Sequence, residues 1–201
     1  MLNLPNLLSF GRLLLTIPLV VLILINTPTA YAVATALFFV GSVTDTLDGR
    51  LARKLRLVSN MGVFLDLTAD KVFVAAGLIA LVQVSLVPAW IAIVIVTREF
   101  LVSGLRALSA AQGVVIPAGR WGKQKTFLTL LGLGGILLAR GLNGRTAFPL
   151  GLSSATHAPA TLGDYLLATA DTLLLLAVVW TVLSAYEYLR DAWGLLMRAQ
   201  Q

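Results

Sequence analysis

Six long apolar stretches restrict the fold of this chain more than any other feature of its sequence. A helix that crosses a lipid bilayer needs about 20 consecutive, mainly apolar residues. Stretches of this kind cover residues 7–25, 30–51, 60–82, 88–110, 122–140 and 163–188. The pattern predicts an all-α integral membrane protein with six transmembrane helices, arranged as a single domain over residues 1–201.

The composition supports a lipid environment. Only 12% of the 201 residues are charged and the mean hydropathy is +0.91, whereas about 25% of the residues of a soluble domain are charged. The N-terminus has no basic stretch of the kind that opens a cleaved signal, and its apolar run continues into a full span. Most of the chain must therefore face lipid or other helices.

The placement of the basic residues predicts the orientation. The connections after the second and fourth stretches and the C-terminal tail carry Lys and Arg, whereas residues 26–29 and 84–88 carry none. Short loops rich in Lys and Arg stay in the cytoplasm, so both termini are predicted to lie there. Arg140 and Arg145, between the fifth and sixth stretches, are exceptions. This bias accounts for the net charge of +6 without a nucleic-acid partner.

Two terminal features carry weaker predictions. Residues 1–9 contain Pro5, which suits a helix start, and this piece is expected to lie at the membrane interface before the chain turns inward. Asp164 is expected to cap the sixth helix. Asp171 lies inside the apolar sixth stretch and has no predicted role.

Four of the nine acidic residues fall within or beside apolar stretches between positions 45 and 70. Each carboxylate at membrane depth costs about 2.5–3.5 kcal/mol, so a bound cation is the simplest compensation. Asp45 and Asp48 share one helix face, as do Asp66 and Asp70. With no cysteine and one histidine in the chain, oxygen ligands favour Mg²⁺, Mn²⁺ or Ca²⁺. Two antiparallel helices would bring the pairs together around one or two ions.

Two other interpretations of these carboxylates remain open on spacing alone. The aspartates would pair with Arg50, Arg53 and Lys71 as structural ion pairs, or they would form the cation site of a transporter or channel.

The segment from Asp45 to Asp70 resembles the motif of the CDP-alcohol phosphatidyltransferase family. That motif reads D-x2-D-G-x2-A-R-x8-G-x3-D-x3-D, and all eight fixed positions match with the same gaps. The resemblance implies a six-helix membrane fold, usually a homodimer, with the site near the cytoplasmic face. It also implies Mg²⁺ or Mn²⁺ as cofactor, one or two ions, held by Asp45, Asp48, Asp66 and Asp70.

The resemblance further assigns roles to single residues. Asp70 would be a metal ligand and also the general base that takes a proton from the acceptor hydroxyl. The CDP-lipid would be bordered by Asp48, Gly49, Ala52, Arg53 and Gly62, and Arg53 is chemically suited to a diphosphate. CMP would then leave as the hydroxyl attacks the phosphorus nearest the diacylglycerol.

A second set of charged residues points to an anionic acceptor. Arg98, Glu99 and Arg106 lie on the fourth stretch, and Lys123 and Lys125 precede the apolar part of the fifth. These groups would bind a phosphate, although a structural Glu99–Arg106 ion pair and an anchor for anionic lipids are alternatives. Lys123 and Lys125 point about 200° apart on an ideal helix. Both would serve one phosphate only if the helix begins between them or the backbone is irregular.

Three segments carry a closer likeness: residues 3–8 with Arg12, residues 97–99 with Arg106, and residues 122–126. Through them, residues 3–126 resemble the bacterial phosphatidylglycerophosphate synthases within this family. That likeness implies a bacterial inner-membrane enzyme that uses CDP-diacylglycerol and glycerol 3-phosphate and lies among membrane lipids. Asn6, Arg12 and Arg120 are further candidate site residues, and Leu67 departs from the Pro that such enzymes commonly have there. Inositol phosphate, serine and phosphatidylglycerol are alternative acceptors.

Overall fold

The computed structural model describes residues 4–55, 60–111, 120–145 and 161–199. Within these ranges the chain forms six helices and no strands, which confirms the predicted all-α class. The helices are α1 (Leu4–Ile25), α2 (Pro28–Leu55), α3 (Asn60–Gln83), α4 (Ala89–Ala111), α5 (Arg120–Gly141) and α6 (Leu162–Ala199).

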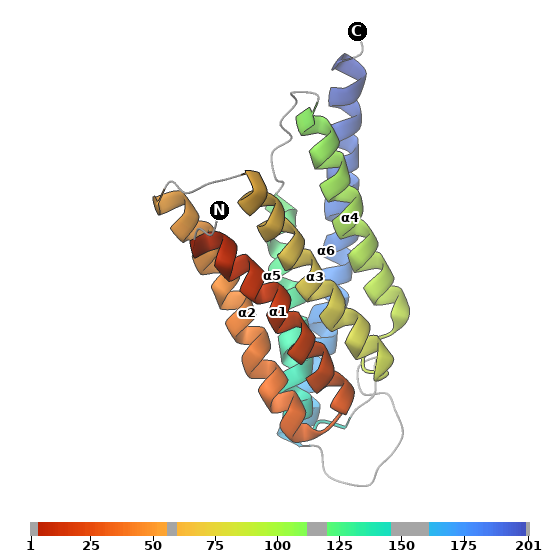
Figure 1. Ribbon diagram of the computed structural model, residues 1–201. Helices are drawn as coiled ribbons and strands as arrows, with labels where there is room; N and C mark the ends of the chain where they lie inside the picture. The colour runs from red at the N-terminus through yellow and green to blue at the C-terminus, as the bar shows by residue number, and fades with distance from the viewer. Residues whose placement is uncertain (1–3, 56–59, 112–119, 146–160, 200–201) are drawn as a thin grey trace.

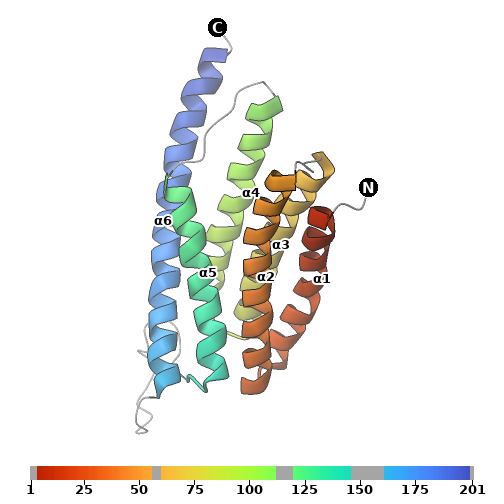
Figure 2. The same cartoon turned by 90° about the vertical axis from the view of Figure 1, so that its left-hand side faces the viewer.

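The helices run alternately up and down, so the two ends of the described chain lie at the same end of the bundle (Figures 1 and 2). Helix α1 packs against α2 and α3, and α2 packs against α5. The closest pair is α5 with α6, and α4 packs against both α6 and α3. The turns after α1 and α3 lie at the opposite end, together with the end of α5 and the start of α6 (Figure 1).

Two boundaries differ from the sequence-based prediction. Helix α1 already begins at Leu4, which confirms the helix start predicted near Pro5, while the interfacial position of residues 1–9 stays a prediction. Pro5 lies in the first turn, where its missing N–H removes no helical hydrogen bond. Helix α6 continues to Ala199 instead of ending near residue 188, because Arg190 and Asp191 interrupt the apolar stretch while residues 189–199 remain rich in strong helix formers.

The turn between α1 and α2 is determined by three consecutive residues. Asn26 adopts a left-handed conformation with φ of 54° and ends α1, with its N–H donating to the carbonyl of Ile23 at 3.1 Å. The hydroxyl of Thr27 accepts a hydrogen bond from the N–H of Ala30 at 3.3 Å and so caps α2. Pro28 takes the first helical position, where its fixed φ is favourable.

The start of α6 is a capping box. Thr161 is the capping residue, and its hydroxyl accepts from the N–H of Asp164 at 3.3 Å. The Asp164 carboxylate accepts in return from the N–H of Thr161 at 2.8 Å and also from the N–H of Arg145 at 2.6 Å. Asp164 therefore helps to cap the sixth helix, as expected. It lies three positions after Thr161, which is the capping residue itself.

Gly163 allows α6 to begin against the end of α5. A Cβ atom there would lie 2.6 Å from the backbone nitrogen of Gly144 and 2.6 Å from the carbonyl oxygen of Leu142. We expect Gly163→Ala to destabilise the protein by about 1–3 kcal/mol, because the clash is with backbone and neither partner can rotate away. Gly104→Ala is the control, since nothing lies within 4 Å of its Cβ position. Thermal unfolding in detergent should show a lower midpoint for the first variant and an equal or higher one for the second.

Large apolar side chains cover much of the outer surface as well as the core. Buried Leu19, Leu81, Ile91 and Leu137 belong to one continuous core cluster. On the outside, Phe39, Ile79, Ile93 and Leu162 are between 60% and 70% exposed. In the described part of the chain, 162–190 is the one helical stretch long and apolar enough to cross a membrane, and 9–25 and 28–44 are shorter apolar stretches.

Candidate active site

Helices α2 and α3 meet beside the acidic motif. The rings of Phe38 and Phe73 stack with centroids 5.5 Å apart and planes inclined by 15°. A Cβ atom on Gly41 would lie 2.6 Å from the Phe73 ring, so the glycine allows this close approach. The contact identifies the face that each of the two helices turns toward the other.

The four aspartate positions continue these facing surfaces. Asp45 and Asp48 follow Gly41 by about one and two helical turns, and Asp70 and Asp66 precede Phe73 by about one and two turns. The side chains of Asp45, Asp48 and Asp66 lie outside the described residues, as do those of Gly49, Ala52 and Arg53. Asp70 and Gly62 are described and are both half-buried.

Helix α1 contributes a buried cation next to the aspartate helices. Arg12 is only 1% exposed and lies on the helix that packs against both α2 and α3. Its backbone carbonyl accepts a hydrogen bond from the hydroxyl of Thr16 at 3.0 Å. A buried guanidinium needs anionic or polar neighbours, which is consistent with its selection as a candidate from the sequence. The side chain of Asn6, the other α1 candidate, lies outside the described residues.

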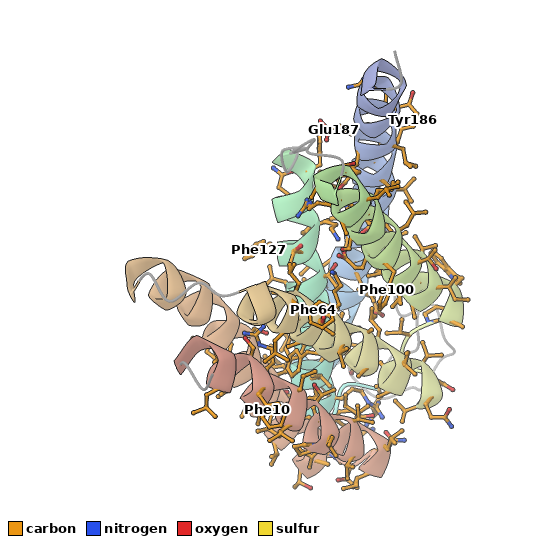
Figure 3. All side chains as sticks on the ribbon, turned by 45° about the horizontal axis from the view of Figure 1, so that its top comes forward. Phe10, Phe64, Phe100, Phe127, Tyr186 and Glu187 are labelled. Carbon is orange, nitrogen blue, oxygen red and sulfur yellow. The ribbon has the colours of Figure 1, made fainter. Side chains whose placement is uncertain are left out.

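A pocket opens where α3, α4 and α5 meet, with an open volume of about 470 Å³. Asp70 and Glu99 both line it, so the acidic motif and the second charged set share one space. The remaining lining residues are Lys71, Val74, Ala75, Ile95, Val96, Phe100, Thr126, Thr129 and Leu130. Each of the three helices also carries an exposed phenylalanine in this part of the molecule, namely Phe64, Phe100 and Phe127 (Figure 3).

Lys125 and Glu99 form an ion pair at the pocket. Lys125 is only 4% exposed, and Glu99 is also 3.5 Å from the guanidinium of Arg98. The charges of Asp70, Lys71 and Arg98 all act on the Lys125 ammonium group. A buried cation held by one carboxylate and surrounded by other cations leaves a positive excess, which suits a dianionic ligand.

Arg98 and Arg106 both reach across to α6. A guanidinium nitrogen of Arg98 donates to the hydroxyl of Ser184, and the Arg106 guanidinium lies 5.9 Å from the ring centroid of Tyr188. The alternative of a structural Glu99–Arg106 ion pair is wrong for the side chains as described, because Glu99 pairs with Lys125 and Arg98 instead.

Lys123 and Lys125 do not meet the condition for joint phosphate binding. Helix α5 begins at Arg120, before both lysines, so the two positions lie about 200° apart around a regular helix. Lys125 pairs with Glu99 at the pocket. The side chains of Arg120 and Lys123 lie outside the described residues.

The contribution of α6 is the part of the site that the sequence analysis missed. Trp180, Ser184 and Tyr188 follow one another at intervals of one turn and face α4 and α5. The Trp180 indole N–H donates to the side-chain oxygen of Gln124 at 2.8 Å, and its ring lies 5.8 Å from that of Trp121. The sequence contained one signal for this contribution: polar or aromatic side chains recur every four residues within an apolar span.

Asp171 lies outside this site. It is 1% exposed, and neither carboxylate oxygen has a hydrogen-bond partner among the described residues. Along α6 it precedes Ser184 by more than three turns.

Together the fold and the site define an all-α protein in which the last aspartate of the motif, Asp70, lines a pocket beside the Glu99–Lys125 ion pair. The sequence matches the family described as CDP-alcohol phosphatidyltransferase over residues 2–183. The chain therefore belongs to the CDP-alcohol phosphatidyltransferase family, and the resemblance seen in the aspartate motif is confirmed.

Several curated relatives are similar to this chain over most of its length. The CDP-diacylglycerol–glycerol-3-phosphate 3-phosphatidyltransferase of Bacillus subtilis is 37% identical, with 96% of each chain covered. The enzyme of the same name from Rickettsia bellii is 34% identical over 94% of each chain. A probable phosphatidylglycerophosphate synthase of Mycobacterium tuberculosis is 32% identical over 96% of this chain and 85% of its own.

Proposed function

We propose that this protein transfers the phosphatidyl group of CDP-diacylglycerol to sn-glycerol 3-phosphate, releasing CMP and forming phosphatidylglycerophosphate. The observation that carries the proposal is the pocket lined by both Asp70 of the family motif and Glu99, which forms an ion pair with Lys125. The names of the relatives from Bacillus subtilis and Rickettsia bellii support the same donor and acceptor.

The enzyme is proposed to span the bacterial inner membrane six times as a homodimer, with the site toward the cytoplasm. The exposed apolar side chains around the bundle support a lipid environment, because contiguous apolar surface is rarely left in water. Helix α2 ends and α5 begins at the same end of the bundle, and the sequence beside both of these helix ends is basic, which supports a cytoplasmic location of that end.

The donor set fits Mg²⁺ or Mn²⁺. Four aspartate positions on facing helix surfaces offer only oxygen ligands. The described side chains, which include Asp70 but not the other three aspartates, contain no group of three metal-binding residues. Asp45, Asp48, Asp66 and Asp70 would hold the cation, and when bound it would offset the negative charge of the diphosphate and of the departing CMP.

Asp70 is assigned the proton transfer. Its carboxylate accepts the proton of the acceptor hydroxyl, whose oxygen forms a bond to the phosphorus next to the diacylglycerol. The bond between that phosphorus and the CMP oxygen breaks, and CMP leaves with the electron pair. Arg53 is assigned to the diphosphate on the strength of the family motif.

The basic residues around Glu99 and α6 are assigned to the acceptor. Lys125, Arg98 and Arg106 offset the dianionic phosphate of glycerol 3-phosphate, and Glu99 holds Lys125 in place. The resulting positive excess favours a phosphorylated acceptor over serine or another acceptor without net negative charge.

An acceptor panel on the purified enzyme tests the proposal. CMP release from CDP-diacylglycerol should require both glycerol 3-phosphate and Mg²⁺ or Mn²⁺, and it should stop when EDTA removes the cation. Serine, which has no net negative charge, should give little product. Inositol phosphate and phosphatidylglycerol are anionic, so their rates relative to glycerol 3-phosphate separate the effect of charge from that of acceptor shape. Activity confined to serine would show that the basic cluster is not an acceptor site, and no CMP release with any acceptor would exclude the enzyme.

A further inference from the structure

Tyr188 has a hydroxyl that is buried and unsatisfied within the described part of the chain. Its side chain lies on α6 and the residue is only 6% exposed. The hydroxyl oxygen has no hydrogen-bond partner among the described residues. A buried hydroxyl without a partner is costly, so native proteins rarely retain one unless a ligand or a water completes it.

The surroundings of Tyr188 indicate what would complete it. Its ring lies below the Arg106 guanidinium, and its phenol also acts electrostatically on Arg98. Arg98 is in turn held by Ser184, one turn earlier on α6. Tyr188 therefore lies close to the guanidinium groups of Arg98 and Arg106, where an anion would be stabilised. A phenolic O–H in that position is a hydrogen-bond donor for which the described side chains supply no acceptor.

We propose that Tyr188 is a specificity-determining residue for the acceptor: its hydroxyl donates a hydrogen bond to the acceptor phosphate, and its ring holds Arg106 against the same group. This inference rests on the proposed function and adds a residue beyond the family match, which ends at residue 183. Ser184 is the positioning residue for Arg98. A phosphate oxygen accepts such a bond strongly because it is ionised, whereas an uncharged acceptor offers no equivalent group.

The test is Tyr188→Phe, which keeps the ring and removes only the oxygen. The KM for glycerol 3-phosphate should rise about tenfold or more, the factor expected for one hydrogen bond to a charged group. The kcat and the KM for CDP-diacylglycerol should stay within about twofold of wild type. The unfolding temperature of the substrate-free protein should not fall, because the hydroxyl has no protein partner among the described residues to lose.

Tyr186→Phe is the matched control. Tyr186 lies two residues earlier on α6, is 69% exposed and points away from the bundle (Figure 3). Its variant should show wild-type constants for both substrates.

The outcomes separate this inference from the proposed function. If the wild-type enzyme uses glycerol 3-phosphate but Tyr188→Phe keeps its KM, or loses kcat and thermal stability instead, the inference alone is overturned. If the wild-type enzyme does not use glycerol 3-phosphate, the proposed function falls and the inference with it.

Discussion

Asp70→Asn should reduce kcat for phosphatidyl transfer by about a hundredfold to ten-thousandfold, the usual contribution of a positioned general base. Asparagine has nearly the same shape but cannot accept the proton of the acceptor hydroxyl. Asp70 lines the pocket that also contains Glu99, so the substitution acts where the acceptor is proposed to bind. Steady-state CMP release at saturating substrates measures kcat, and retention of the CDP-diacylglycerol KM would show that nucleotide binding largely survives.

Asp171→Asn provides the matched control for this result. It makes the same chemical change at another carboxylate of the bundle, which is buried and lies outside the pocket. Its kcat should remain close to that of the wild type. Near wild-type turnover in Asp70→Asn would show that Asp70 is not the base.

Lys125→Met should lower kcat/KM for glycerol 3-phosphate by about a hundredfold or more. Truncating one partner of a buried charge pair costs about 2–5 kcal/mol, and each 1.4 kcal/mol is a factor of ten. The variant removes a cation that is 4% exposed and leaves the Glu99 carboxylate facing the incoming phosphate. Initial rates at varied glycerol 3-phosphate measure the effect, while the KM for CDP-diacylglycerol should change little.

Two further variants test the reason for that loss. Adding Glu99→Gln to Lys125→Met removes the unpaired carboxylate and should recover part of the affinity for glycerol 3-phosphate. Arg145→Met removes an exposed cation at the opposite end of the bundle and should have no effect. A loss in Lys125→Met that affected CDP-diacylglycerol instead of the acceptor would reassign Lys125 to the nucleotide site.

The helices were largely predictable from the sequence because apolar stretches long enough to cross a bilayer have few other stable conformations. Five of the six helices begin and end within four residues of the predicted boundaries. The exception is α6, because the charged residues Arg190 and Asp191 end the apolar stretch without ending the helix. The family was predictable for a different reason. Eight fixed positions between Asp45 and Asp70 constrain the sequence far more tightly than general hydropathy does.

The partners within the site were less predictable. Glu99 and Arg106 share a helix face by spacing, yet Glu99 pairs with Lys125 from α5 and Arg106 contacts Tyr188 from α6. Such pairs depend on how the helices pack, which spacing within one helix does not encode. For the same reason Ser184 and Tyr188 were not selected, since the sequence does not show that α6 lies beside α4.

The tight turns described above have a consequence for how this molecule can adapt. Asn26, Thr27, Thr161 and Gly163 secure the end of the bundle away from Lys125. Changes at these turns would alter the temperature that the molecule withstands without altering which acceptor it selects. At these turns, heat tolerance can therefore change without a cost to substrate choice.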